Sequence, residues 1–142
     1  MFIDKIIHIL YFFSKFMEEQ IEFNYVSKLL LKKFPDFIEG DLWYDGDEIL
    51  EYQIASNFAR YILKNADENN MEQMKKCFEF IELLLINGTE KTKELAVIGY
   101  LEDLQNFTGG NKIMEKYEFI YDFLGIESKK WWNTLNDLWS GK

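Results

Sequence analysis

The sequence predicts an all-α fold, built either as an irregular helical bundle or as a short α-solenoid of about six to seven helices. Eight glycines and one proline in 142 residues are too few for a sandwich or barrel, which needs a turn about every ten residues. Apolar residues recur instead at spacings of three and four, which is the period of an amphipathic helix. The length suits one domain over residues 1–142, and 48% hydrophobic residues are enough for a core.

The first predicted helix, residues 1–17, is apolar almost all round. Asp4, His8, Tyr11 and Lys15 share one narrow stripe, and apolar residues fill most of the rest. The longest run without a charged residue is nine residues, 6–14, whereas a membrane span needs about 20. We therefore expect no membrane insertion. We expect burial of residues 2–17 on more than one side, within the chain or across a homodimer.

The middle of the chain carries five further helical patterns, each ended by a recognisable break. Pro35 ends the first of them, the tandem Gly109-Gly110 separates the last two, and Gly88 and Gly125 also follow apolar periodicity. Thr89 is the expected N-cap of the fourth. The expected ranges are 21–34, 47–64, 71–87, 90–106 and 113–124.

A tryptophan-rich helix, residues 128–142, ends the chain, with Ser128 as its expected N-cap. Its large apolar residues fall within an arc of roughly 120° at 100° per residue. They are Trp131, Trp132, Leu135, Leu138 and Trp139. We expect this face to dock on the core, because burial ties down a terminus that would otherwise fray. A partner-binding face is the alternative.

The residue types that usually carry catalysis or metal binding are scarce. His8 and Cys77 are the only histidine and cysteine, so a four-ligand zinc site and an internal disulfide are both excluded. We expect His8 at the surface and Cys77 in the core. The segment from Asp41 resembles a calcium loop, but Trp43 and Tyr52 stand where that loop requires oxygen ligands. We therefore expect no cofactor, no metal and no enzymatic activity, in a reducing, cytoplasmic compartment.

The formal net charge of −9 restricts the partners that the protein can bind. Nucleic acids and anionic membranes are bound by basic surfaces, so neither is expected as a partner. A basic protein would be attracted.

The acidic residues are densest between Phe34 and Ala59, where no lysine or arginine occurs. An ordinary solvated loop would explain the charge, but aromatic residues among the acids favour a binding surface. The candidate partner-binding residues are Asp36, Glu39, Asp41, Trp43, Tyr44, Asp45, Asp47, Glu48 and Glu51.

Several segments together resemble small helical bacterial proteins associated with polymorphic or contact-dependent toxin systems. They are LLLKKFPDF, IASNFARYI, KELAVIGYLEDLQN and LGIESKKWWNTLNDLW, which cover much of the chain from Leu29 onward. The resemblance implies an all-α, non-enzymatic immunity protein that neutralises a partner toxin. It leaves the first helix as an addition, and it identifies no toxin-contact residue.

The function that we expect is therefore direct binding of a basic toxin domain, for instance a nuclease with a cationic substrate groove. The alternative is a general interaction or regulatory module that pairs through its apolar first helix. A third reading, an enzyme on an unfamiliar helical scaffold, also stays open.

Overall fold

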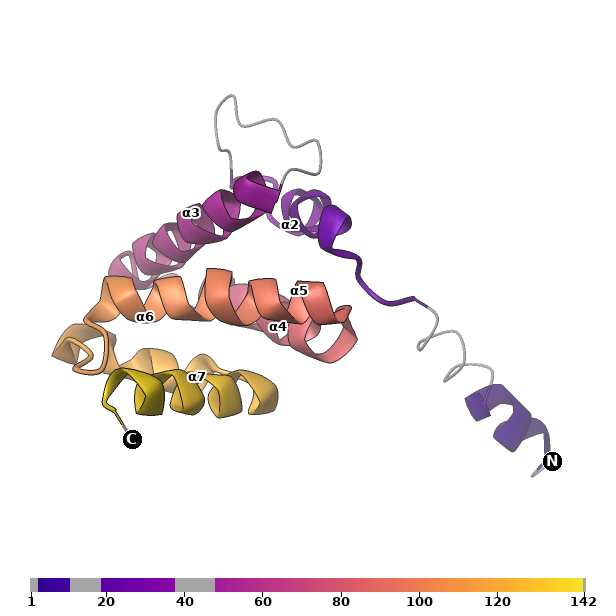
Figure 1. Cartoon of the computed structure of the whole chain (residues 1–142). Helices are drawn as coiled ribbons and strands as arrows, with labels where there is room; N and C mark the ends of the chain where they lie inside the picture. The colour runs from indigo at the N-terminus through magenta and orange to yellow at the C-terminus, as the bar shows by residue number, and fades with distance from the viewer. Residues whose placement is uncertain (1–2, 11–18, 38–47, 142) are drawn as a thin grey trace.

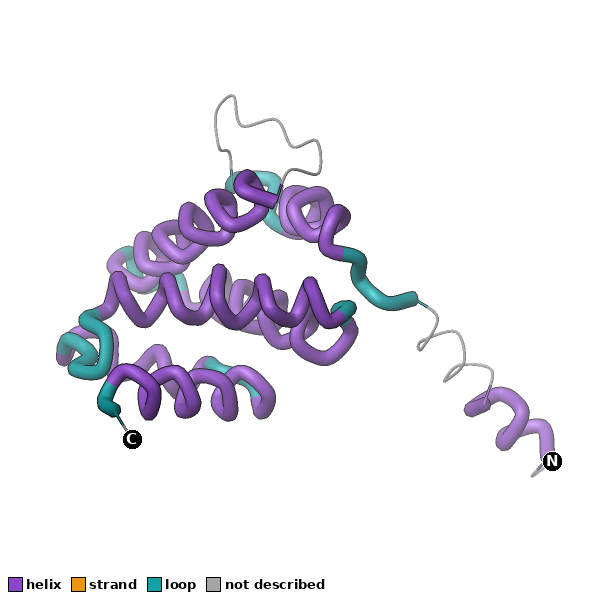
Figure 2. Tube along the Cα trace, viewed as in Figure 1, coloured by secondary structure: helices purple, strands orange, loops and turns teal. Residues whose placement is uncertain are grey.

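The computed structural model describes residues 3–10, 19–37 and 48–141. The regular structure in these ranges is helical, which confirms the all-α prediction (Figures 1 and 2). A single bridge between Ile21 and Gly88 is the β-type pairing found in the described part of the chain. No helix in these ranges is both long and apolar enough to cross a bilayer.

The helices follow one another through short connections. The α-helices are α2 (Val26–Lys33), α3 (Glu48–Asp67), α4 (Met71–Asn87), α5 (Glu90–Glu94), α6 (Glu102–Thr108) and α7 (Ile126–Trp139). Two 3₁₀ segments, η1 (Phe23–Tyr25) and η3 (Glu115–Phe123), and a π-helical segment, η2 (Leu95–Leu101), complete the order. Residues 3–10 form a further helix, called the N-terminal helix below.

The helices stack in layers, as Figure 1 shows. The middle layer holds α4 beside one continuous helical rod made of α5, η2 and α6. On one side, α3 packs on η2, α6 and α4, with α2 beside it. On the other side, α7 packs on α4 and η2, and η3 also contacts α4. This stack of helix pairs buries both faces of its middle layer.

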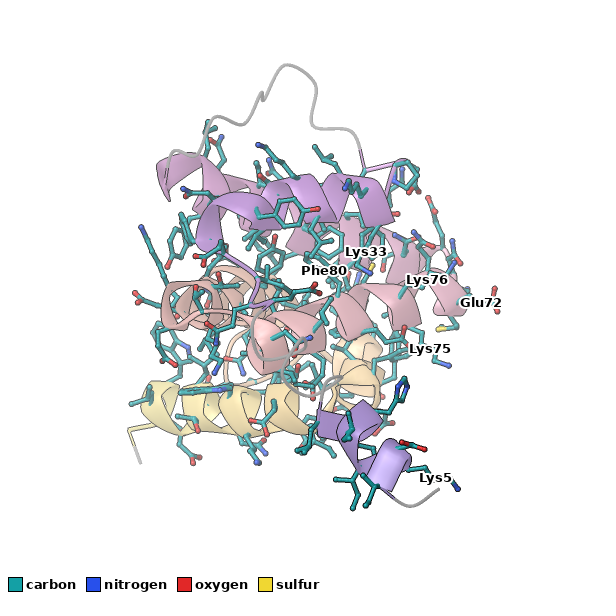
Figure 3. All side chains as sticks on the ribbon, turned by 90° about the vertical axis from the view of Figure 1, so that its right-hand side faces the viewer. Lys5, Lys33, Glu72, Lys75, Lys76 and Phe80 are labelled. Atoms are coloured by element: carbon teal, nitrogen blue, oxygen red, sulfur yellow. The ribbon has the colours of Figure 1, made fainter. Side chains whose placement is uncertain are left out.

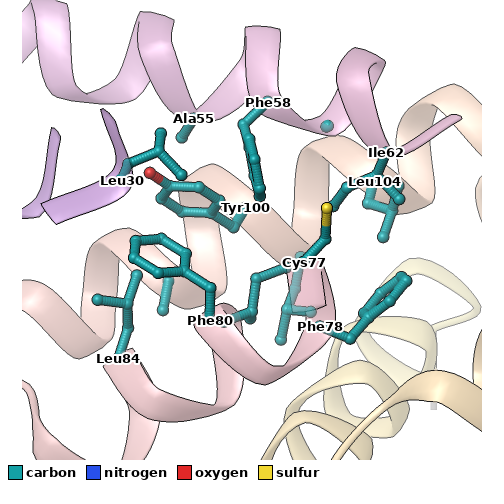
Figure 4. Close-up of a cluster of buried hydrophobic side chains, with 14 of the residues drawn as sticks. Leu30, Ala55, Phe58, Ile62, Cys77, Phe78, Phe80, Leu84, Tyr100 and Leu104 are labelled. Carbon is teal, nitrogen blue, oxygen red and sulfur yellow. The ribbon is translucent and has the colours of Figure 1, made fainter. Parts of the chain in front are cut away.

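The core between α3 and the middle layer is rich in aromatic rings (Figure 4). Phe58 of α3 is its centre: edge-to-face ring contacts join it to Phe34 at 5.0 Å, Phe37 at 5.3 Å, Tyr100 at 5.9 Å and Phe80 at 6.0 Å between centroids. Such pairs stabilise a core beyond the apolar area that they bury. They fix the end of α2, and the residues that follow it, against the body.

Two predicted α-helices have a different helical form. The expected helix 90–106 contains the π segment η2, in which six of seven residues are buried. Because nearly every position there is apolar or small, the apolar spacing cannot reveal the wider turn. The expected helix 113–124 is the 3₁₀ segment η3, which buries Tyr117 and Ile120 three residues apart. That spacing equals one turn of a 3₁₀ helix.

The terminal helix docks by a narrower face than the sequence predicts. Trp132 and Leu135 are buried, but Trp131, Leu138 and Trp139 are substantially exposed. The buried Gln105 side chain donates a hydrogen bond to the Trp132 carbonyl oxygen at 2.9 Å, which adds to the docking. Trp131 and Leu138 lie at one edge of the predicted arc, whereas Trp139 is the last residue of α7, one turn beyond the buried Leu135.

The prediction that Ser128 is the N-cap of the terminal helix is wrong. The helix begins two residues earlier, at Ile126, and Gly125 occupies the N-cap position without a side-chain hydrogen bond. By contrast, Thr89 caps α5 as predicted: its Oγ1 accepts a hydrogen bond from the Thr92 N–H at 3.3 Å.

The N-terminal helix does not enter the core of its own chain. Every residue from 3 to 10 is exposed, including His8, whose surface position was predicted. The exposed apolar side chains are Ile3, Ile6, Ile7, Ile9 and Leu10. The prediction that these residues are buried within the chain is therefore wrong. Their burial across a homodimer stays a prediction.

Candidate functional site

The structure describes only part of the predicted partner-binding surface. Asp36 and Glu51 are described in full, and Glu48 is the first residue of α3, although its side chain is outside the described part. The remaining predicted residues, Glu39, Asp41, Trp43, Tyr44, Asp45 and Asp47, lie outside the described ranges.

Glu51 does not belong to any partner-facing surface, which corrects the prediction for this residue. Its side chain is 1% exposed, and Oε1 accepts a hydrogen bond from the Ser27 N–H at 3.1 Å. Ser27 is in the first turn of α2, so this carboxylate caps that helix from α3. Burial raises the pKa of Glu51, and hydrogen bonding from Ser27 opposes the rise.

The spacing along α3 could have revealed this position. Glu51 precedes the buried residues Ala55, Phe58 and Ile62 by four, seven and eleven positions. These are positions on one face of a helix, so Glu51 points into the core together with them.

Asp36 is exposed and held by a short hydrogen-bond relay. The Tyr61 hydroxyl donates to Asp36 Oδ2 at 2.8 Å, and the Gln73 Nε2 donates to the Tyr61 hydroxyl oxygen at 2.8 Å. Burial is the main reason that the pKa of Tyr61 rises to about 12. The phenol therefore stays protonated at neutral pH and keeps the Asp36 carboxylate in a fixed orientation.

Asp36 opens onto a polar groove of about 380 Å³, which we call the Asp36 groove. Its charged lining residues are Asp36, Arg60, Lys64 and Glu68, and asparagines supply much of the remaining polar lining. Two acids face two bases, so the groove has no strong preference for one sign of ligand charge. It offers hydrogen bonds to a polar segment of a partner instead.

Arg60 is positioned by two neighbours, Phe107 of α6 and Asn57 of α3. Its guanidinium carbon lies 4.7 Å from the centre of the Phe107 ring, and Nη1 donates to Asn57 Oδ1 at 3.1 Å. Arg60, Lys64 and the polar role of Tyr61 were not predicted from the sequence. Their positions three and four residues apart on α3 are a detectable signal, because they share one helix face.

The described residues contribute charged and hydrogen-bonding side chains to the Asp36 groove. No cluster of three or more metal-binding side chains occurs among them. Cys77 is fully buried, as predicted, and burial raises the pKa of its thiol far above the ordinary value. A thiol in this environment is a poor nucleophile.

One comparison with known proteins is informative. A family model described as a domain of unknown function, DUF7674, matches residues 27–140. The chain belongs to the DUF7674 family. The matched range begins in the first turn of α2 and ends just after α7, so the DUF7674 domain contains both Glu51 and the Asp36 groove, and the N-terminal helix lies outside it. No curated protein and no solved structure matches the chain.

Another face of the DUF7674 domain carries lysines together with acids, as Figure 3 shows for Lys75, Lys76 and Glu72. Lys33 of α2 and Lys76 and Glu79 of α4 line a groove of about 470 Å³ that reaches the buried Phe80, and Lys75 is exposed nearby on α4. Because acids lie among the lysines, this face has no strong preference for one sign of partner charge.

Proposed function

We propose that this DUF7674 domain is a non-catalytic, cytoplasmic immunity protein that neutralises a basic toxin domain by binding it directly. The observation that carries the proposal is the run from Phe34 to Ala59, which contains seven acids and no lysine or arginine, in a chain of net charge −9. Asp36, the first of these acids, is exposed and accepts a hydrogen bond from the Tyr61 hydroxyl.

The proposed surface consists of the predicted residues without the buried Glu51. These are Asp36, Glu39, Asp41, Trp43, Tyr44, Asp45, Asp47 and Glu48. A nuclease toxin needs a cationic groove for its substrate, and an acidic surface on a stable helical body can occupy that groove. Attraction between the two raises the association rate and is screened beyond about 8 Å at physiological salt.

The proposal is tested with the product of the neighbouring gene, ideally a secreted multi-domain toxin encoded immediately upstream. Association and dissociation rates are measured over a salt series for the native chain and for the triple variant Asp41→Lys, Asp45→Lys and Asp47→Lys. We expect slower association and a flatter salt dependence for the triple variant. Trp43→Ala should mainly speed dissociation, because aromatic anchors determine residence time.

A matched control separates a local surface from net charge alone. Glu115, Glu118 and Asp122 are exposed acids on η3, and their reversal to lysine changes the charge by the same amount. This control should bind at nearly the native rate, and circular dichroism should show that both triple variants are folded. If both reversals slow association equally, binding follows net charge and the proposed surface is wrong. If neither does, the site is elsewhere, for example on the exposed faces between Met71 and Asn106.

The second candidate function is a general interaction or regulatory module that works as a homodimer. The observation that favours it is the exposed apolar N-terminal helix, since a free apolar surface of this kind usually marks an interface. A gene neighbourhood of metabolic genes without a toxin would favour this candidate over the immunity function.

A further inference from the structure

Two apolar surfaces of the described chain have no partner within it. One is the N-terminal helix, whose five apolar side chains, Ile3, Ile6, Ile7, Ile9 and Leu10, are all exposed. At 100° per residue they cover an arc of roughly 160°, so most of one side of this helix is apolar. A helix with such a side is stable when that side lies against another apolar surface.

The other surface is a groove of about 440 Å³ between the α5–η2 rod and α7, which we call the apolar groove. Its apolar lining is Val97, Ile98 and Trp131, of which Ile98 is 44% and Trp131 43% exposed. Charged residues of both signs, Glu90, Lys91, Lys93 and Glu94, form its polar edge. An apolar floor with a charged edge suits an amphipathic helix.

The chain leading to the N-terminal helix leaves the body at one end of the apolar groove. Ile21 donates a backbone hydrogen bond to the Asn87 carbonyl at 2.8 Å. Its own carbonyl accepts from the Thr89 N–H at 3.1 Å and from Thr92 Oγ1 at 2.8 Å. Asn87, Thr89 and Thr92 flank Glu90, which is the first residue of the rod that lines the apolar groove. Ile21, from which the chain leads to the N-terminal helix, is therefore held beside the apolar groove.

We propose that the N-terminal helix of one protomer lies in the apolar groove of a second copy, and that reciprocal exchange forms a two-fold homodimer. The described N-terminal helix stands away from its own stack of helices (Figure 1), and its exposure shows that it makes no burying contact there. The ten residues 11–20 can span up to roughly 33 Å, which is enough to reach a neighbouring molecule. Reciprocal exchange buries the N-terminal helix and the apolar groove of both protomers at once.

The charges of the two surfaces are compatible with this arrangement. Asp4 and Lys5 on the N-terminal helix carry both signs, and so does the edge of the groove, through Glu90, Lys91, Lys93 and Glu94. Neither surface therefore carries a net charge that would repel the other. The proposed dimer does not depend on toxin binding, and all of its tests use this chain alone.

The first test is sedimentation equilibrium of the full chain over a concentration series. Ile7→Glu in the helix and Ile98→Glu in the groove should each raise the dimer dissociation constant by at least about tenfold, because each places an unpaired carboxylate in an apolar contact. Leu31→Glu on α2 is the matched control, since Leu31 is 42% exposed and lies outside the groove. It should leave the dimer intact.

The second test identifies which chain occupies the groove. Chains carrying Ile7→Cys are mixed with chains carrying Ile98→Cys and oxidised. The native Cys77 is fully buried and does not compete. A disulfide joining one chain of each kind is expected, and Leu31→Cys in place of Ile98→Cys should give no such product. In the double variant Ile7→Cys/Ile98→Cys, a cross-link within one chain at high dilution would place the helix in its own groove and overturn the proposal.

Two further outcomes also overturn the proposal. One is a chain that stays monomeric at every concentration. The other is a dimer that survives Ile7→Glu or Ile98→Glu with circular dichroism unchanged, since the interface would then lie elsewhere.

Discussion

The carboxylate of Glu82 on α4 caps the first turn of α7. Its Oε1 accepts hydrogen bonds from the Ser128 N–H and Oγ, both at 2.8 Å, and Oε2 accepts from the Glu127 N–H at 3.0 Å. Glu51 of α3 caps the first turn of α2 in the same way, because its Oε1 accepts a hydrogen bond from the Ser27 N–H. In both cases a carboxylate of one helix satisfies the unpaired N–H groups at the start of another. The Glu82 cap therefore joins α7 to the middle layer, and the Glu51 cap joins α2 to α3.

We predict that Glu82→Ala destabilises the fold by about 1–3 kcal/mol, because hydrogen bonds to a charged acceptor are lost and the N–H groups of α7 stay partly buried. Glu79→Ala is the control, since Glu79 is an exposed acid on the same helix. Its effect should stay within about 0.5 kcal/mol. Urea unfolding followed by circular dichroism measures both. Equal effects for the two variants would contradict the capping role.

A side chain at position 125 would displace the Glu82 carboxylate that caps α7, so we expect this position to require glycine. A Cβ atom at this position would lie 2.6 Å from each carboxylate oxygen of Glu82. Gly125→Ala should therefore cost about 1–3 kcal/mol in the native chain. It should cost much less in the Glu82→Ala background, so a double-mutant cycle should show a clear coupling free energy. Additive effects would mean that the glycine is needed for another reason.

The three tryptophans of α7 should differ in their contribution to stability. Trp132 is 1% exposed, whereas Trp139 is 53% exposed. Trp132→Ala should cost about 3–5 kcal/mol, and Trp139→Ala about 1 kcal/mol or less. Removing residues 128–142 should destabilise the whole domain, because it removes Trp132 and Leu135 together. A truncated chain with an unchanged melting temperature would contradict the docking of this helix.

The stability of the protein should depend on pH through Glu51. Burial raises its folded-state pKa above the ordinary 4.5, so the folded protein holds this proton more tightly than the unfolded chain. The stability that the raised pKa of Glu51 contributes is therefore fully present below about pH 4.5. It is lost as the pH rises through the pKa of Glu51 in the folded protein. Glu51→Gln should be more stable than the native chain at neutral pH, with a difference that shrinks toward pH 4.

This prediction is checked by urea unfolding at several pH values between 4 and 8. Glu79→Gln, at an exposed position on α4, should parallel the native chain throughout. A difference between Glu51→Gln and the native chain that does not change with pH would show that Glu51 does not titrate in this way.

The sequence by itself determined the all-α class, the extent of α4, the Thr89 cap and the burial of Cys77. These features depend on local pattern: apolar residues at spacings of three and four, scarce glycine and proline, and a capping hydroxyl beside the first turn. Composition also determined the net charge of −9, on which the proposed function depends. None of these features requires knowledge of which helices become neighbours.

The tertiary structure alone decided which helix or helix end each buried polar or aromatic side chain meets. Glu51 was predicted to be a surface acid. The sequence around a glutamate does not show whether its carboxylate faces water or the N-terminus of another helix. Glu82 was not singled out, and Ser128 was given its capping role, because the true cap comes from a residue 46 positions earlier in the chain. Likewise, Trp132 and Trp139 lie two turns apart on the same face of α7, yet Trp132 is buried and Trp139, the last residue of the helix, is exposed, because packing decides which turns of a helix meet a neighbour.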